Sequence, residues 1–308
     1  MIFLTKRILS KTGIIIMHSY LRAIGFKGIN KRSELKKVLK KVLIDSDEKQ
    51  YVTLGDDSIA VEYRKNFSDS VGIAVCGEFS ETADFDYEFY YPYFRGNYVG
   101  TNAEISIERH SEKETYAGVF DDSRVGISII FFLQNRLDYI KAGMKNEIYD
   151  IRSAVILSAM ASSGSIMLPI KKNQRQIQNY KKDIINRSNL IKAARQGDED
   201  AMETLTLEDI DTYSAISRKI LDEDVFSLVD TYLMPYGIEC DIYSILGEIL
   251  DIKEEVNCLT NEKIYIITLN CNDLIVDVCI NKKDLIGEPA KGRRFKGTVW
   301  LQGKINFN

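Results

Sequence analysis

The sequence predicts an α+β protein built from three parts, and three observations support that fold class. First, 308 residues are enough for two or three domains that each bury a core. Second, short β-rich runs separated by turn residues stand on both sides of a central helical segment. Third, the runs do not alternate with helices in βαβ fashion, which argues against a doubly wound nucleotide-binding fold.

The boundaries of these parts follow from changes in pattern. Residues 1–16 hold Lys6, Arg7 and Lys11 but lack a secretory apolar core and cleavage site, and we expect them to be a non-native or disordered extension that precedes a natural start at Met17. We predict an antiparallel-sheet domain with one helix over 17–170 and a helical segment over 171–236. Residues 237–308 suit a small antiparallel β-barrel of the oligonucleotide-binding type, or an equally small sandwich.

The clearest helix of the N-terminal part covers residues 31–44. Its apolar residues recur at helical spacing from Leu35 to Leu43, and Lys and Arg occupy most other positions. Such a basic amphipathic helix can bind a membrane or nucleic acid, but it more commonly docks on a core with its charged face in water. Strands are predicted over 58–67, 71–79, 84–94, 103–110, 114–120 and 125–137, and a hairpin is predicted from 153–161 and 165–170 around Ser162-Ser163-Gly164.

The helical segment divides into two halves of opposite charge. Its first half, 171–195, carries eight Lys or Arg and one Asp, and the stretch 198–224 carries ten carboxylates. Gly197 with Asp198 is a helix stop followed by the next N-cap. We expect the two halves to attract each other as antiparallel helices, although exposed ion pairs add little stability.

Composition and motifs exclude several kinds of chemistry. The formal charge is −4, and only two histidines are present, of which His110 lies in a polar turn. The five cysteines form no C-x-x-C pair, and an odd number of thiols fits a reducing cytoplasm. No apolar run reaches the roughly 18–20 residues of a membrane span. No phosphate loop, dinucleotide fingerprint, zinc-protease motif or esterase elbow occurs, so we expect no cofactor.

The last predicted strand, 294–307, has one apolar face and one polar face. Alternate residues from Phe295 to Phe307 form the interior face, and the other set places Trp300 among Lys296, Gln302 and Lys304. Seven Lys or Arg against two acids from 282 to 304 leave a local charge of +5. Aromatic rings stack on the bases of single-stranded nucleic acid, and neighbouring cations attract its phosphates. We therefore predict a nucleic-acid-binding set of five residues: Arg293, Arg294, Lys296, Trp300 and Lys304. Alternatively, Trp300 packs under the neighbouring helical part with its N–H bonded there.

A row of carboxylates lies in the run 84–94. Alternation puts Asp84, Asp86 and Glu88 on one face of that strand and a row of aromatic residues on the other. Three carboxylates in a row could ligate a hard cation or share a proton in a metal-dependent enzyme. The alternative is an edge strand whose charged outer face blunts edge-to-edge pairing.

Four runs carry a resemblance to a known family: MHSYLRAIGFKGI (17–29), AARQGDEDAMETLTLEDIDTYSAISRKI (193–220), DVFSLVDTYLMPYGIECDIYSILGEI (224–249) and GEPAKGRRFKGTVWLQG (287–303). They resemble domain-of-unknown-function family 3881, an uncharacterised family of anaerobic Gram-positive bacteria, from Met17 to the C-terminus. The resemblance implies a bacterial cytoplasmic protein and brings no activity or functional residue with it.

Three functions therefore compete. The leading hypothesis is a non-catalytic interaction or regulatory protein, because no nucleophile, metal or phosphate constellation is recognisable. Its surfaces would be the charged helical segment and the Trp300 face. The alternatives are single-stranded nucleic-acid binding through the C-terminal part and a carboxylate enzyme that uses a divalent metal.

Overall fold

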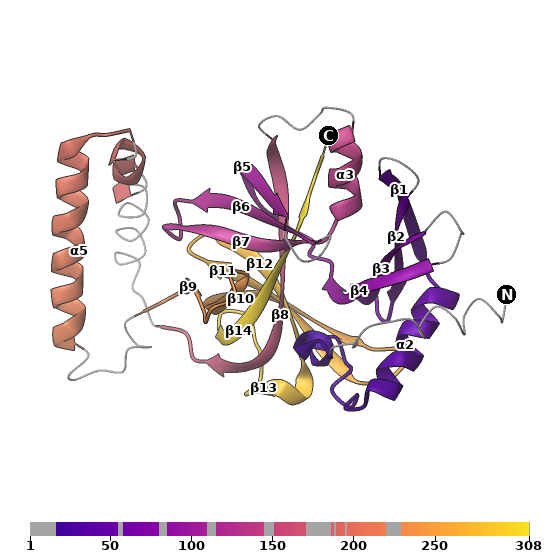
Figure 1. The fold of residues 1–308 in the computed structure, drawn as a ribbon. Helices are drawn as coiled ribbons and strands as arrows, with labels where there is room; N and C mark the ends of the chain where they lie inside the picture. Colours follow the sequence, from indigo (N-terminus) through magenta and orange to yellow (C-terminus); the bar gives the residue numbers. More distant parts are fainter. Residues whose placement is uncertain are drawn as a thin grey trace.

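A computed structural model describes the greater part of the chain: residues 17–54, 58–79, 85–109, 115–144, 151–170, 186–187, 189–194, 196–219 and 229–307. The extension 1–16, Asp84 and His110 lie outside these ranges. The protein is mostly β-sheet with few helices (Figure 1), so the predicted mixed α+β class is confirmed.

The N-terminal part is an antiparallel sheet of four strands in the order β1-β2-β3-β4. The strands are β1 (Glu48–Leu54), β2 (Ser58–Asn66), β3 (Val71–Phe79) and β4 (Phe85–Phe94). The 3-10 helix η1 (Ser19–Arg22) and helix α2 (Arg32–Ile44) precede the sheet. Helix α2 buries Leu35, Val38, Leu39 and Val42, as the helical spacing predicts, and leaves its lysines on the outer face.

The second sheet has ten strands and runs in the order β11-β12-β8-β5-β6-β7-β14-β10-β9, with β13 beside β8. Helix α3 (Arg136–Met144) follows the third strand of this sheet along the chain. The strands are β5 (Val99–Arg109), β6 (Tyr116–Asp122), β7 (Ile127–Leu133), β8 (Ile151–Met167), β9 (Tyr232–Pro235), β10 (Ile242–Val256), β11 (Lys263–Cys271), β12 (Leu274–Asn281), β13 (Leu285–Ile286) and β14 (Arg294–Ile305). A short 3-10 helix, η2 (Lys282–Asp284), joins β12 to β13.

The hairpin predicted around Ser162-Ser163-Gly164 is wrong. These residues lie inside one strand of 17 residues, which pairs antiparallel with β14 along most of its length. The glycine is needed for packing and not for a turn, because a Cβ on Gly164 would lie 2.4 Å from Cε2 of the buried Phe295 ring.

Pairings in the larger sheet cross the boundaries predicted at residues 170 and 237. Strand β8 lies before the helical segment, yet it pairs with β12 and β14, which lie after it. The strands β8, β12, β11, β10 and β14 therefore form a closed circuit of pairings. The C-terminal strands therefore do not form an independent closed sheet, because β8 is the fifth strand of this circuit.

Strand β14 separates two hydrophobic cores. Phe295, Val299, Leu301 and Ile305 belong to the core of the larger sheet, which agrees with the interior face predicted for this strand. Trp300, on the opposite face, belongs to the core shared with α2 and the four-stranded sheet. The smaller sheet therefore covers the face of β14 that the sequence pattern predicts to be polar.

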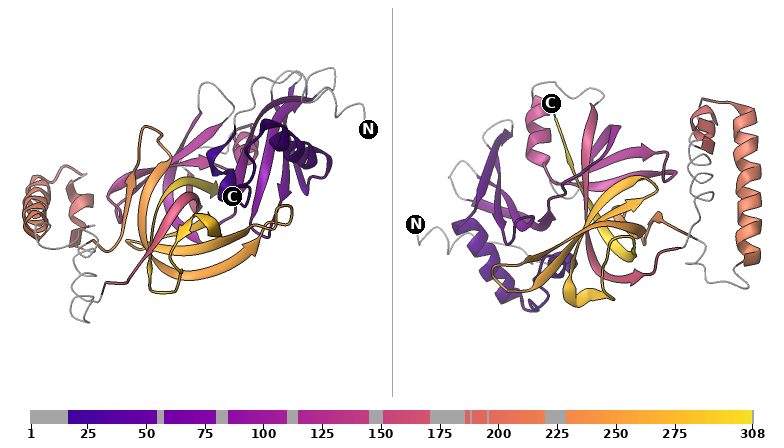
Figure 2. Two further views of the ribbon diagram at one scale, coloured as in Figure 1. Left: turned by 90° about the horizontal axis from the view of Figure 1, so that it is seen from below. Right: turned by 180° about the vertical axis from the view of Figure 1, so that it is seen from behind.

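The helical segment stands at the far end of the molecule from the four-stranded sheet (Figures 1 and 2). Its long helix is α5 (Glu199–Lys219), beside a short helical stretch at 189–194. Gly197 has φ +89°, and the Asp198 carboxylate accepts a hydrogen bond from the Ala201 amide, so the predicted stop and N-cap are confirmed. None of the helices within the described ranges is long and apolar enough to span a membrane.

The close packing at Gly164 gives the first prediction. Replacing Gly164 with Val forces two methyl groups against Phe295, and we expect the free energy of unfolding to fall by about 1–3 kcal/mol. Ser163→Val at the exposed neighbouring position is the matched control, with a change within about 0.5 kcal/mol. Urea denaturation followed by circular dichroism measures both, and equal stability of the two variants would contradict the packing argument.

Candidate functional site

Trp300, the aromatic residue of the predicted nucleic-acid face, is buried in the interface between the sheets. Its side chain is 6% exposed, and its ring lies 4.6 Å from the His18 ring and 5.2 Å from the Phe132 ring, between centroids. Its Nε1 donates a hydrogen bond to Oδ2 of Asp241 at 2.7 Å. The indole therefore lacks an open face for stacking on a base, and its described neighbours lie outside the helical segment.

The four cations of the same set occupy different environments. Arg294 is 7% exposed and donates to the backbone oxygens of Leu168 and Val229, whereas Arg293 donates to the backbone oxygen of Glu288. Lys296 is half-buried, and Lys304 is exposed. The set does not form one accessible strip, so the nucleic-acid hypothesis for these residues stays a prediction without its aromatic platform.

The carboxylate row of strand β4 is interrupted by a β-bulge. Cys76 of β3 faces Phe89, and Gly77 faces Tyr87, so Glu88 is the extra residue and the simple alternation ends there. Oε2 of Glu88 lies 3.9 Å from Nη1 of Arg136. The described residues contain no group of three or more His, Cys, Asp or Glu that could hold a metal ion. Because Asp84 lies outside them, the metal site of Asp84, Asp86 and Glu88 stays a prediction.

A buried polar cluster joins the two sheets, and the sequence analysis missed it. Glu62 accepts a hydrogen bond from Nε of Arg64, and its Oε2 lies 3.6 Å from Nε of Arg136. Nη2 of Arg64 and the hydroxyl of Tyr91 both donate to the backbone oxygen of Gln134, at 2.6 and 3.0 Å. A charged pair two residues apart on a strand marks one face, but only the fold shows that another sheet covers that face.

The electrostatics of this cluster favour a structural role. Burial raises the pKa of the Cys76 thiol and that of the Tyr91 hydroxyl well above their ordinary values. Both groups therefore remain protonated near neutral pH, and the thiol is no activated nucleophile. Removing one partner of a buried ion pair leaves an uncompensated charge, so the cluster fixes how the sheets dock.

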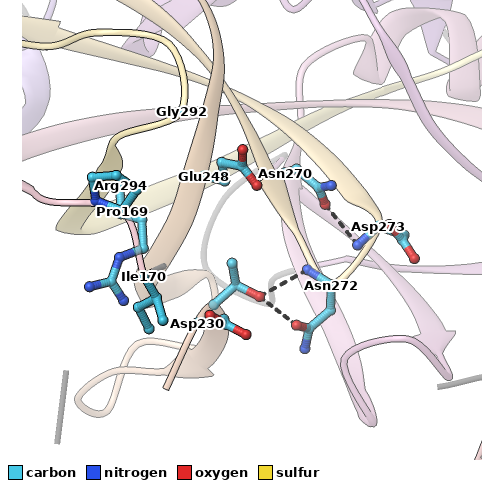
Figure 3. A pocket seen from close by; sticks show the side chains of 10 residues that line it. Pro169, Ile170, Asp230, Glu248, Asn270, Asn272, Asp273, Gly292 and Arg294 are labelled. Atoms are coloured by element: carbon cyan, nitrogen blue, oxygen red, sulfur yellow. Dashed lines mark hydrogen bonds between the residues drawn. The ribbon is translucent and has the colours of Figure 1, made fainter. Parts of the chain in front are cut away.

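A small polar cavity lies where the helical segment leaves and re-enters the larger sheet (Figure 3). It has a volume of about 160 Å³ and is lined by Pro169, Ile170, Asp230, Thr231, Glu248, Asn270, Asn272, Asp273, Gly292 and Arg294. The hydroxyl of Thr231 donates to Oδ1 of Asn272, and the Asp273 amide donates to Oδ1 of Asn270. Arg294 donates to the backbone oxygen of Leu168, just before the helical segment, and to that of Val229, in the last part of the segment, so this region anchors both ends.

Helix α5 has one face that packs and one that remains open. Ala201 is 5% exposed and lines the contact with the stretch 189–194, and Glu208 lies 3.8 Å from Arg187. At 100° per residue the opposite face carries Glu199, Glu203, Leu207 and Ile210. Leu207 and Ile210 are each 56% exposed. Carboxylates beside exposed apolar side chains form a surface that can bind another protein.

The fold and its surfaces define a mixed α+β protein with two docked sheets and a charged helical segment at one end. The chain belongs to the family described as "Domain of unknown function, E. rectale Gene description (DUF3881)", whose model matches residues 21–303. This match confirms the resemblance noted in the sequence. No curated protein and no solved structure matches the chain.

The burial of Trp300 gives a direct prediction, because it is the only tryptophan in the chain. We expect iodide to quench its fluorescence at least about fivefold less than that of free tryptophan amide, since the quencher must reach the ring. Trp300→Ala should lower the free energy of unfolding by about 3–5 kcal/mol. Quenching as efficient as in the free amide, with an unchanged stability, would show that the ring is exposed.

Proposed function

We propose that this protein is a non-catalytic interaction protein and that the open face of α5 is its binding surface. The observation that carries the proposal is the exposure of Leu207 and Ile210 on a helix whose own packing uses the other face. An amphipathic helix with an unused apolar stripe is a common element of protein recognition. The neighbouring Glu199 and Glu203 favour a partner with basic residues around an apolar contact.

The setting we propose is the cytoplasm. All five cysteines are free thiols, and Cys240 and Cys258 are exposed, which suits a reducing compartment. The two alternatives draw less support from the described surface. Nucleic-acid binding at Trp300 lacks an accessible ring, and the carboxylates of β4 do not share one uninterrupted face.

The variant Leu207→Glu with Ile210→Glu tests the proposal. It adds two charges to the apolar stripe, so we expect recovery of the partner from a lysate of the native host to fall at least about tenfold. Affinity capture with quantitative mass spectrometry measures the recovery, and circular dichroism verifies that the variant is folded. The control is Leu259→Glu with Ile286→Glu, which makes the same change at an exposed turn position and an exposed strand position far from α5 in the sequence. Equal recovery by the two variants would refute the role of α5.

A further inference from the structure

Helix α2 carries a row of lysines that form no ion pair within the described residues. Lys36 and Lys37 are exposed and Lys40 is half-buried, and all three lie away from the buried leucines and valines. In the parts of the chain that the structure describes, Lys41 of this helix forms an ion pair with Asp45 at 3.6 Å. The ammonium groups of Lys36, Lys37 and Lys40 have no ion-pair partner there. An unneutralised cationic row attracts a surface of opposite charge.

The cationic row ends in an exposed apolar side chain. Lys36, Lys40 and Ile44 follow one another at intervals of four residues, and Ile44 is 60% exposed at the C-terminal end of the helix. Residues four apart are neighbours along one line of a helix surface. The order along α2 is therefore charge, charge, apolar.

The open face of α5 repeats this order with the opposite charge. Glu199, Glu203 and Leu207 are also spaced by four residues, and all three side chains are exposed. In a parallel alignment Lys36 faces Glu199, Lys40 faces Glu203 and Ile44 faces Leu207. An antiparallel alignment would keep Lys40 against Glu203. It would set Ile44 against Glu199 and Lys36 against Leu207, so one ion pair and the apolar contact would be lost. Rows of this kind run alongside each other when the helix axes cross at roughly 50°.

The positions of the two helices decide whether the contact forms within one chain or between chains. α2 lies beside the four-stranded sheet, and α5 lies at the opposite end of the molecule, beyond the larger sheet (Figures 1 and 2). One copy therefore cannot bring its own α5 onto its own α2 in this structure. A second copy offers the complementary helix with no rearrangement of either chain.

We propose that α5 of one copy docks in parallel on α2 of a second copy. This inference rests on the proposed function of α5 and names its partner. Because the two surfaces differ, the contact is heterologous, and repeating it links molecules head to tail into open chains or a ring. Two exposed ion pairs and one small apolar contact give weak association, with a dissociation constant of about 0.1–1 mM at low salt.

Sedimentation of the purified full chain tests the proposal. At about 50 mM salt we expect the weight-average mass to rise with protein concentration up to about 1 mM, and at about 500 mM salt we expect the monomer mass. Lys36→Glu with Lys40→Glu should abolish association at low salt, and Glu199→Lys with Glu203→Lys should do the same, because each variant sets like charges against each other.

A mixture of the two variants provides the decisive measurement. Each reversed helix then meets a helix of opposite charge on the other variant, so we expect the mixture to associate as the unmodified chain does. Lys141→Glu with Lys304→Glu changes the net charge of the chain as much as the reversal on α2 does, at exposed sites away from both helices, and should leave association unchanged.

Two results would overturn the proposal: a monomeric chain at every concentration and salt, or association that the reversals on α2 and α5 do not alter. Neither result bears on the capture of partners from a lysate. A monomeric chain whose α5 stripe is still required for that capture would show that α5 binds a different protein, and the proposed function would stand.

Discussion

The hydrogen bonds of Gln302 hold the two sheets together in the C-terminal half of strand β14. This side chain is fully buried; its Nε2 donates to the backbone oxygen of Pro92, and its Oε1 accepts from Nε2 of Gln134 and from the Phe94 amide. An unpaired amide at this depth would cost stability, so both sheets must meet with these groups aligned. Trp300 and the Glu62–Arg64 pair act in the same interface, and together they make the face of β14 an internal surface.

This constraint determines where function can lie. Side chains such as Trp300 and Gln302, which are buried between the sheets, cannot form a binding platform, and the polar groups there fix how the sheets dock. Two of the described surfaces that lie outside this interface are the cationic face of α2 and the mixed acidic and apolar face of α5. Each of these faces points away from the side on which its helix packs, so we expect substitutions there to have little effect on the core.

The sequence predicts those features that depend on local pattern. The bounds of α2 and β3, the stop at Gly197 and the cap at Asp198 follow from spacing and turn chemistry, because these signals act within a few residues. The pairing of β8 with β14, the cover over Trp300 and the bulge at Glu88 depend on segments far apart in the chain. A strand with one polar face has the same sequence pattern whether water or a second sheet covers that face. The sequence therefore predicts the strand that carries Trp300 but not whether its polar face is exposed.

Site-specific photo-crosslinking in the cell shows whether the open face of α5 binds a partner. A photoreactive amino acid replaces Leu207 in one strain and Leu259, exposed on a turn of the sheet, in another. If this face binds a partner, a discrete crosslinked species forms from position 207, with another protein or a second copy, and none forms from position 259. Absence of any adduct at 207, or equal adducts at both positions, would contradict it.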